Sequence, residues 1–221
     1  MNVTVIGAGL AGSEAAWQLA QRGFHVTLRE MKPQKMSPAH HTSAFAELVC
    51  SNSLRGAGLE NAVGLLKEEL RRLDSVILRC ADTHRVEAGA ALAVAREGFS
   101  RAVTEAVKNH PLITGEAGEV TEIPAGQVII AAGPLASEGL TAAIQREFPG
   151  SGTLNFFDAA APLVSFESID MEKAWFASRY DKGTPDYINC ALSREEYLAF
   201  WQELRMAEEA EVHGFEDSQV F

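Results

Sequence analysis

The sequence has few cysteines and no long apolar run, and both absences narrow what the protein can be. Its three cysteines, Cys50, Cys80 and Cys190, are odd in number and far apart, which suits a reducing cytoplasm and excludes a CxxC metal knuckle. No apolar run reaches the roughly 18 residues of a membrane span, and Met1 leads into the chain without a basic, apolar signal segment. We therefore expect a cytoplasmic protein with no membrane partner.

The sequence also lacks an excess of positive charge. The formal net charge is −11 over 221 residues, which on its face disfavours a polyanionic partner. The charge is uneven, because residues 1–60 hold five basic against four acidic side chains, whereas residues 165–221 hold five against thirteen. An acidic tail of this kind is typical of a solvated face. The first sixty residues are therefore the better source of a local basic surface, with Lys35 and Arg55 as leading candidates.

The first thirty residues contain the pattern around which the rest is organised. Asn2 to Ile6 is a β-branched and aliphatic run that predicts a buried strand, and it enters a glycine turn. A helix is predicted over Ser13 to Arg22, with Gly23 as its stop, and a second strand over His25 to Leu28 then delivers Glu30. This order of elements predicts a Rossmann-like α/β fold that binds a dinucleotide.

Each glycine of the turn has a physical task in that interpretation. Gly7 permits the tight turn, Gly9 lets the backbone approach a pyrophosphate, and Gly12 lets the helix pack closely on the strand. Glu30 stands where an acid accepts hydrogen bonds from ribose hydroxyls, and its charge would repel a 2′-phosphate. The alternative is a glycine-rich turn between packed elements. The predicted cofactor contacts are Glu30 and the whole turn: Gly7, Ala8, Gly9, Leu10, Ala11 and Gly12.

The segment from Met31 to Arg55 is too long to be a plain connection, which indicates a functional loop. Its adjacent histidines, His40 and His41, could contact substrate or cofactor, or could simply be polar loop residues. No Cys/His/Asp set completes a metal site at familiar spacing, so we expect no metal. Cys50 follows an apolar patch and precedes Ser51-Asn52-Ser53, small polar residues that could cap a helix or donate to a ligand. A lone cysteine is either a buried small hydrophobe or a reactive thiol, and both readings stay open here.

Periodicity predicts most of the remaining elements. The helix over Asn61 to Leu73 should bury a stripe that includes Leu66 and Leu73 and turn Lys67 outward. The run from Gln127 to Pro134 predicts a short, fully buried strand that ends in a glycine turn. In two-dinucleotide-binding folds such a strand returns to the sheet beside the first strand, and its glycine, here Gly133, lies near the cofactor. The other expected elements are two short strands within Arg85 to Val94, a helix over Glu97 to Asn109, a strand or hairpin within Leu112 to Ile123, and helices over Ser137 to Glu147 and Ser193 to Ala207, the last with Ser193 and Glu196 as a capping box.

A change of texture near Pro149 to Gly152 predicts a domain boundary. Beyond it lie an apolar stretch with one acid, Asn155 to Pro162, and a polar turn, Ser178 to Gly183. We expect two regions. Residues 1–163 form the first, incomplete part of a cofactor domain, and residues 164–221 form the incomplete beginning of an inserted α+β substrate domain.

Several motifs together carry a family resemblance that is more specific than the glycine turn. The chain resembles the folate- and FAD-dependent tRNA uracil-5-methyltransferases, which are relatives of the GidA-type flavoproteins that modify wobble uridine. Family members are about twice as long, so the resemblance is to their N-terminal half. The matching stretches are Gly7 to Ala16, Pro38 to Thr42, Phe45 to Arg55, Leu66 to Glu69, Asp158 to Pro162 and Ser178 to Gly183.

The resemblance implies a two-dinucleotide-binding flavoprotein fold and a reductive methylation. A one-carbon unit passes from methylenetetrahydrofolate to uracil C5 in the T-loop of tRNA and is reduced with FAD that NAD(P)H replenishes. Cys50 matches a family cysteine tied to this chemistry, as C6 nucleophile or in handling the C5 proton. Two other readings stay open: another GidA-like flavin or nicotinamide oxidoreductase, including a wobble-uridine enzyme, and a nucleotide-binding fragment without turnover.

Overall fold

The structure is a computed structural model that describes residues 2–148, 164–178 and 184–208. It divides into two compact units. Unit 1 comprises Met1–Val86 and Ala91–Ala159, and unit 2 comprises Glu87–Ala90 and Ala160–Phe221. The predicted boundary at Pro149 to Gly152, the apolar stretch Asn155 to Pro162 and the turn residues 179–183 lie outside the described residues.

Unit 1 is built on a four-stranded parallel sheet in the order β6-β2-β1-β7. β1 pairs with β2 on one side and with β7 on the other, so the predicted return of the late strand beside the first is confirmed. This is the Rossmann-like α/β architecture that the sequence predicts. The strands are β1 (Asn2–Ile6), β2 (His25–Glu30), β6 (Ile113–Ala117) and β7 (Gln127–Ile130).

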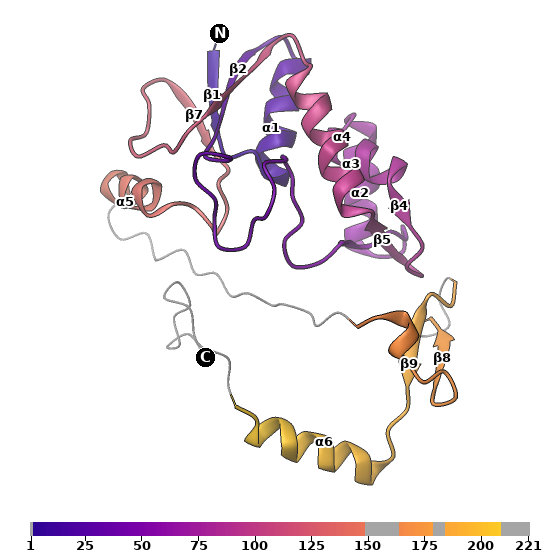
Figure 1. Ribbon diagram of the computed structural model, residues 1–221. Helices are drawn as coiled ribbons and strands as arrows, with labels where there is room; N and C mark the ends of the chain where they lie inside the picture. Colours follow the sequence, from indigo (N-terminus) through magenta and orange to yellow (C-terminus); the bar gives the residue numbers. More distant parts are fainter. Residues whose placement is uncertain (1, 149–163, 179–183, 209–221) are drawn as a thin grey trace. The chain divides into compact units, whose positions relative to one another are not determined.

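Helices cover the two faces of this sheet unequally (Figure 1). α1 (Leu10–Gln21) and α4 (Arg96–Lys108) lie on one face, where Val5 and Leu28 join Phe99 in the main core. α5 (Glu138–Glu147) lies on the other face, where Leu140 packs with Ile6 in a smaller cluster. Because parallel strands are joined by crossovers, the carboxyl ends of β1, β2, β6 and β7 meet at one edge.

A second, three-stranded antiparallel sheet in the order β3-β5-β4 completes the strands described in unit 1. β4 and β5 are the two short strands predicted within Arg85 to Val94. Between β3 and β4 the chain forms two helices, of which only the first is predicted from periodicity. The bounds are β3 (Ser53–Gly56), α2 (Ala62–Arg72), α3 (Val76–Thr83), β4 (Arg85–Val86) and β5 (Ala91–Val94).

The described part of unit 2 is a two-stranded antiparallel hairpin and a helix. The predicted capping box at the start of the helix is confirmed, since Ser193 Oγ accepts from Glu196 N and Glu196 Oε2 accepts from Ser193 N. None of the residues described in this unit is buried. The elements are a short 3₁₀ helix (Phe166–Ser168), β8 (Ala174–Ala177), β9 (Tyr187–Cys190) and α6 (Arg194–Met206).

Three details of the predicted elements are wrong. α1 begins at Leu10, three residues earlier than predicted, because Gly9 already serves as its N-cap. β7 is not fully buried: among the strands that the structure describes it lies at the sheet edge, and Ile129 and Ile130 are each 37% exposed. In α2 the predicted stripe is wrong, because Lys67 is buried whereas Leu66 and Leu73 are exposed.

The burial of Lys67 has a local cause. Its ammonium donates to the carbonyl oxygen of Gly56 at 3.0 Å and to that of Val63 at 3.3 Å, so the side chain folds over the β3–α2 turn. Burial, reinforced by the nearby guanidinium groups of Arg71 and Arg55, lowers the pKa of Lys67.

Candidate functional site

The glycine turn between β1 and α1 is shaped by two close backbone approaches. Gly7 has φ +96°, and a Cβ there would lie 2.7 Å from Ala132 Cα. A Cβ at Gly12 would lie 1.7 Å from the carbonyl oxygen of Gly7. Neither position can carry a side chain without moving backbone, so both glycines are required by the protein's own packing.

Gly9 differs from the other two glycines of the turn, Gly7 and Gly12. A Cβ built on Gly9 meets nothing within 4 Å, and its φ of −69° is open to any residue. Gly9 is the N-cap of α1 yet supplies no side-chain cap, which leaves the N–H groups of the first turn for another acceptor. The absence of a side chain here keeps space open at a helix N-terminus, where an anion is favoured.

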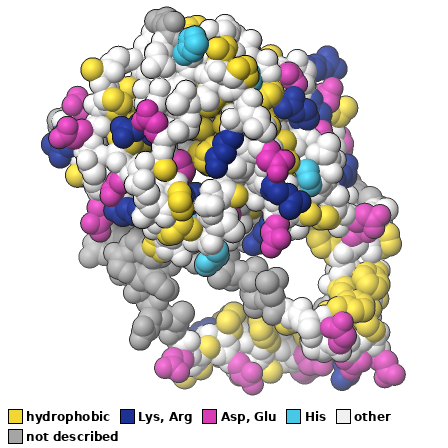
Figure 2. Space-filling view, turned by 45° about the horizontal axis from the view of Figure 1, so that its top comes forward, with side chains coloured by type: hydrophobic (Ala, Val, Ile, Leu, Met, Phe, Trp, Pro, Cys, Tyr) yellow, Lys and Arg dark blue, Asp and Glu magenta, His cyan; other side chains and the backbone are white. Residues whose placement is uncertain are grey.

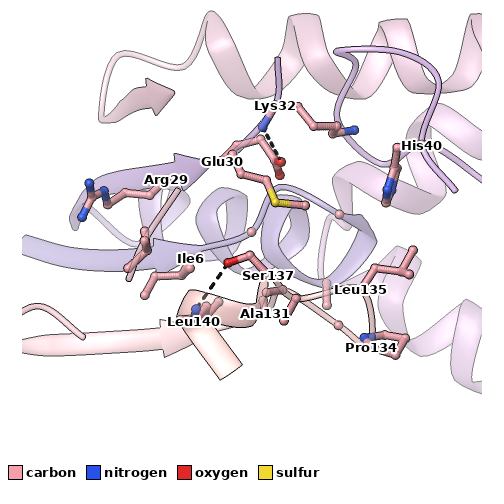
Figure 3. A pocket seen from close by; sticks show the side chains of 18 of the residues that line it. Ile6, Arg29, Glu30, Lys32, His40, Ala131, Pro134, Leu135, Ser137 and Leu140 are labelled. Atoms are coloured by element: carbon pink, nitrogen blue, oxygen red, sulfur yellow. Dashed lines mark hydrogen bonds between the residues drawn. The ribbon is translucent and has the colours of Figure 1, made fainter. Parts of the chain in front are cut away.

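A cavity of about 260 Å³ opens beside this helix N-terminus (Figure 3). Its wall comes from the carboxyl ends of β1, β2, β6 and β7 and from the segment after β2. Ala8 and Gly12 are buried but are not part of the wall. Six of the eight predicted cofactor residues line it: Gly7, Gly9, Leu10, Ala11, Glu30 and Gly133.

Glu30 is held in this wall by main-chain donors on both of its oxygens. Oε2 accepts from Ala8 N at 2.7 Å. Oε1 accepts from Lys32 N at 3.0 Å (Figure 3). The residue is only 8% exposed. Because each carboxylate oxygen has two lone pairs, Glu30 keeps acceptor capacity for a hydroxyl after both of these bonds are made.

The segment after Glu30 returns to the glycine turn. Ala46 N donates to the carbonyl oxygen of Ala8 at 2.9 Å, and Ala46 is fully buried with φ +50°. The buried ammonium of Lys32 donates to Ala44 O at 2.6 Å and lies 3.6 Å from Glu47 Oε2. Hydrophobic periodicity does not predict these contacts, because they join residues of an irregular segment. The only sign of them in the sequence is the presence of a lysine and a glutamate within that segment.

Two ionisable groups of this segment, both in the cavity wall, have shifted pKa values. Burial and the Lys32 ammonium lower the pKa of His40, against a smaller opposite effect of Glu47 and Glu30. Burial alone would raise the pKa of Glu47, but N–H donors from His41 and Thr42 and the Lys32 charge bring it below its ordinary value. At neutral pH the wall therefore presents a neutral imidazole and an ionised carboxylate.

Cys50 is exposed and follows Val49, which lines the cavity, but Cys50 itself is not in the wall. Of the two possibilities for Ser51 to Ser53, a helix cap is wrong, because Ser53 begins β3 and the Ser51 hydroxyl accepts from Ser53 N instead. The other cysteine of unit 1 contrasts with it: Cys80 is buried, and burial raises its pKa. Of these two thiols, only Cys50 is accessible to a reactant.

The basic residues of the first sixty positions are mostly paired. Arg29, Lys32 and Lys35 lie 3.5, 3.6 and 2.9 Å from Glu116, Glu47 and Glu119, respectively. Figure 2 likewise shows acidic and basic side chains interspersed over the visible face of the larger body.

Two absences hold for the described residues. Among residues 2–148, 164–178 and 184–208 there is no group of three or more His, Cys, Asp or Glu side chains that could hold a metal ion. Within the same ranges no helix has the length and apolar character needed to cross a membrane.

The parallel sheet, the open glycine turn at a helix N-terminus and the acid at the end of β2 define a dinucleotide-binding domain of the Rossmann type. Within that class, the chain belongs to the glucose inhibited division protein A family, whose family model matches residues 2–221.

Relatives of high identity share one name. The chain is 59% identical to the methylenetetrahydrofolate--tRNA-(uracil-5-)-methyltransferase TrmFO of Desulfitobacterium hafniense, over 99% of this chain and 50% of that protein. It is 60% identical to the protein of the same name from Symbiobacterium thermophilum, over 99% of this chain and 49% of that protein. The chain thus spans about half the length of the curated relatives it matches.

Solved structures resemble the chain only remotely. A crystal structure of CtdE in complex with FAD and substrate 4 is 18% identical with a TM-score of 0.39, covering 65% of this chain and 40% of that one. A crystal structure of FqzB is 17% identical with a TM-score of 0.42, covering 69% and 39%. These likenesses are too weak to bear on the function.

Proposed function

We propose that this chain is part of a folate- and FAD-dependent enzyme that methylates uracil C5 in the T-loop of tRNA, in the cytoplasm. The observation that carries the proposal is the 59% identity, over nearly the whole chain, to a relative named as that methyltransferase. Residues 1–163 would supply the first part of the FAD domain, and residues 164–221 the beginning of the substrate domain.

The residues of the cavity fit FAD. The N–H groups at the start of α1 would receive the pyrophosphate across Gly9, where no Cβ obstructs the approach. Glu30 would accept hydrogen bonds from the adenosine ribose, and Gly133, with φ +66° and open space at its Cβ position, would allow close approach from β7. When bound, FAD reduced by NAD(P)H supplies the two electrons that convert the methylene unit of methylenetetrahydrofolate into a methyl group.

The protein's part in this reaction is to activate a weak nucleophile and remove a proton. Uracil C5 becomes nucleophilic only when C6 is attacked, and the C5 proton must later leave to a base. Cys50 is the residue that we propose for this chemistry, as nucleophile or in handling the proton. Support comes from its exposure and from its position directly after Val49 in the cavity wall.

Docking of tRNA requires cations that are free to meet phosphates. Of the two sequence candidates, Lys35 is engaged by Glu119, so Arg55 is the stronger. Arg55 has no acidic partner among the described residues and is exposed beside the β3–α2 turn. An Arg55→Ala variant is expected to weaken tRNA binding across sequences and to reduce its salt dependence, whereas Lys35→Ala should change both less.

The proposal is tested on the full-length protein by a paired measurement on Cys50→Ser. The two side chains are close in size and Cys50 is exposed, so thermal unfolding and FAD content should not change. Single-turnover methyl transfer to tRNA uracil should fall by orders of magnitude. Cys190→Ser is the matched control, since Cys190 is also exposed. Normal transfer in a Cys50→Ser preparation with full flavin content would refute the assignment.

The alternative is a different flavin-dependent reaction, such as wobble-uridine modification. The use of folate as the carbon donor distinguishes the proposed reaction from this alternative. Transfer of labelled carbon from methylenetetrahydrofolate to the T-loop supports the proposed reaction, whereas NADH oxidation without such transfer favours the alternative. A chain that binds nucleotide but supports neither reaction would be a non-catalytic module.

A further inference from the structure

A buried ion pair joins the two ends of the segment that follows Glu30. Lys32 stands two residues after Glu30, and Glu47 stands three residues before Cys50. Their side chains are 4% and 12% exposed, and Lys32 Nζ lies 3.6 Å from Glu47 Oε2. Both residues also line the cavity. The two side chains therefore form part of the cavity wall and also belong to the segment that leads to the exposed Cys50.

The contacts around the pair fix the backbone between these two residues. Lys32 Nζ donates to Ala44 O at 2.6 Å, while Glu47 Oε1 and Oε2 accept from His41 N and Thr42 N at 2.9 and 3.3 Å. Lys32 therefore holds main chain near the far end of the segment, and Glu47 holds main chain five and six residues before it, in addition to the contact that the two residues make with each other. Removing either one leaves a buried charge and unpaired main-chain groups.

The same segment is attached to the glycine turn at one residue. Ala46 lies between Ala44, whose carbonyl oxygen Lys32 binds, and Glu47, and its N–H donates to Ala8 O at 2.9 Å. Ala8 N in turn donates to Glu30 Oε2 at 2.7 Å. The left-handed backbone of Ala46, at φ +50°, is costly for a residue with a side chain and persists only where surrounding contacts impose it.

We propose that Lys32 and Glu47 are positioning residues: together they hold the segment 33–49 against the glycine turn, which completes the dinucleotide cavity and sets the location of Cys50. The inference rests on the proposed function in that the cavity is taken to bind FAD. The pair contacts no reacting atom in this assignment. It acts by coupling the cofactor wall to the thiol through about fifteen residues of otherwise irregular chain.

The exposed pair Lys35–Glu119 provides a matched control. It joins the same segment to the chain after β6 at 2.9 Å, but its side chains are 46% and 25% exposed. Exposed ion pairs contribute little because water already solvates both charges. If any ion pair on this segment sufficed, the two pairs would behave alike.

The test uses full-length protein carrying Lys32→Met, Glu47→Gln or both, with Lys35→Met as control. FAD affinity is measured by titration of apoprotein, and the alkylation rate of the Cys50 thiol is followed by peptide mass spectrometry. Each single variant is expected to raise the FAD dissociation constant by at least about tenfold and to change the Cys50 alkylation rate. Lys35→Met should leave both near the wild-type values.

The double variant distinguishes a coupled pair from two independent residues. Since it leaves no lone buried charge, its FAD affinity should be weakened less than the two single effects multiplied together. This comparison remains available if one single variant fails to fold. Fully multiplicative effects, or an unchanged Cys50 alkylation rate in a variant with weakened FAD binding, would overturn the proposal. Wild-type protein that takes up no FAD would instead refute the proposed function.

Discussion

The two units of the chain are stabilised in different ways. Unit 1 contains every buried residue that the structure describes, including Val5, Leu28 and Phe99 around its parallel sheet. Unit 2 has regular elements, but none of its described residues is buried, and Trp175, Phe176 and Trp201 are each at least 41% exposed. Regular secondary structure alone is therefore no sign of a core.

Local interactions account for the elements that unit 2 does form. β8 and β9 pair through four cross-strand positions, and α6 begins with a complete capping box. Tyr187 Oη donates to Ala88 O at 2.9 Å, and Gly89 N donates to Asp186 Oδ2 at 2.6 Å. Such hydrogen bonds fix the register of the strands and the start of the helix, whereas apolar burial supplies most of the free energy of folding.

The largest predicted effect compares one phenylalanine in each unit. Phe99 is fully buried in unit 1, so Phe99→Ala should lower the free energy of unfolding of that unit by about 3–5 kcal/mol. Phe200 is 55% exposed on α6, so Phe200→Ala should change stability by less than about 0.5 kcal/mol. Hydrogen exchange resolved by peptide measures both. Equal losses would show that unit 2 has a core of its own.

The next prediction concerns a cap that reaches between helices of unit 1. Glu14 Oε2, on α1, accepts from Ser75 Oγ at 2.8 Å and from Ile77 N at 3.1 Å at the start of α3. Glu14→Ala should cost about 1–3 kcal/mol, because charged hydrogen bonds at a partly buried site are lost. The exposed Glu105 of α4 is the control, and Glu105→Ala should be close to neutral in the same denaturant titration.

A smaller effect is expected from the serine caps, and it should differ between the units. Ser193→Ala removes the cap of α6 and should weaken that helix by about 1 kcal/mol. Ser137→Ala removes the corresponding bond to Leu140 N at 3.3 Å in unit 1, where Leu140 is buried in the small core cluster. Exchange of amide protons in α6 should therefore accelerate more than exchange in α5. The reverse order would contradict the comparison.

The smallest effect is a dependence on pH. The pKa of His40 is lowered from 6.5, so the unfolded chain takes up that proton first and unit 1 loses stability as the pH falls through this value. The pKa of Glu47 is lowered from 4.5, so its contribution is present above that value and is lost as the pH falls further. In unit 2, hydrogen bonds from Thr184 and the Gly89 N–H lower the pKa of Asp186, and hydrogen bonds from Ser193 lower the pKa of Glu196. Asp186 is only partly buried and Glu196 is exposed, so salt should screen both groups.

Thermal unfolding between pH 7 and pH 4 at moderate salt checks this prediction. Unit 1 should lose stability on acidification, and His40→Gln should remove the upper part of that loss. An unchanged profile in His40→Gln would assign the dependence to other groups.

The sequence predicts most of unit 1 because its elements follow local rules. A β-branched run, a glycine turn and helical periodicity are visible in neighbouring residues, and the start of α6 is predicted from Ser193 and Glu196 alone. By contrast, the start of α3 is stabilised by its local N-cap, Ser75, and also by Glu14, which lies sixty-three residues before the Ile77 N–H that it accepts from. Periodicity over neighbouring residues does not reveal the contact with Glu14.

The candidate site divides in the same way. Gly7, Gly9 and Glu30 are predictable because the turn and the acid stand at fixed distances from a strand. The contributions of Lys32, Glu47 and Ala46 are not, because they arise from tertiary contacts of irregular chain. The prediction that Lys67 points outward is wrong for a related reason. Its ammonium donates to main-chain carbonyl oxygens, and a helical pattern of apolar residues does not indicate such contacts.

The hydrogen bonds of Glu30 have a consequence for the rate of ligand association. Main-chain donors stabilise this carboxylate when the chain folds, so its orientation does not depend on an incoming hydroxyl. A ligand that meets an already ordered acceptor loses little affinity to the entropy of arranging it. Encounter, rather than rearrangement around Glu30, should then limit binding of the ribose end, and the observed rate should rise linearly with ligand concentration instead of reaching a plateau.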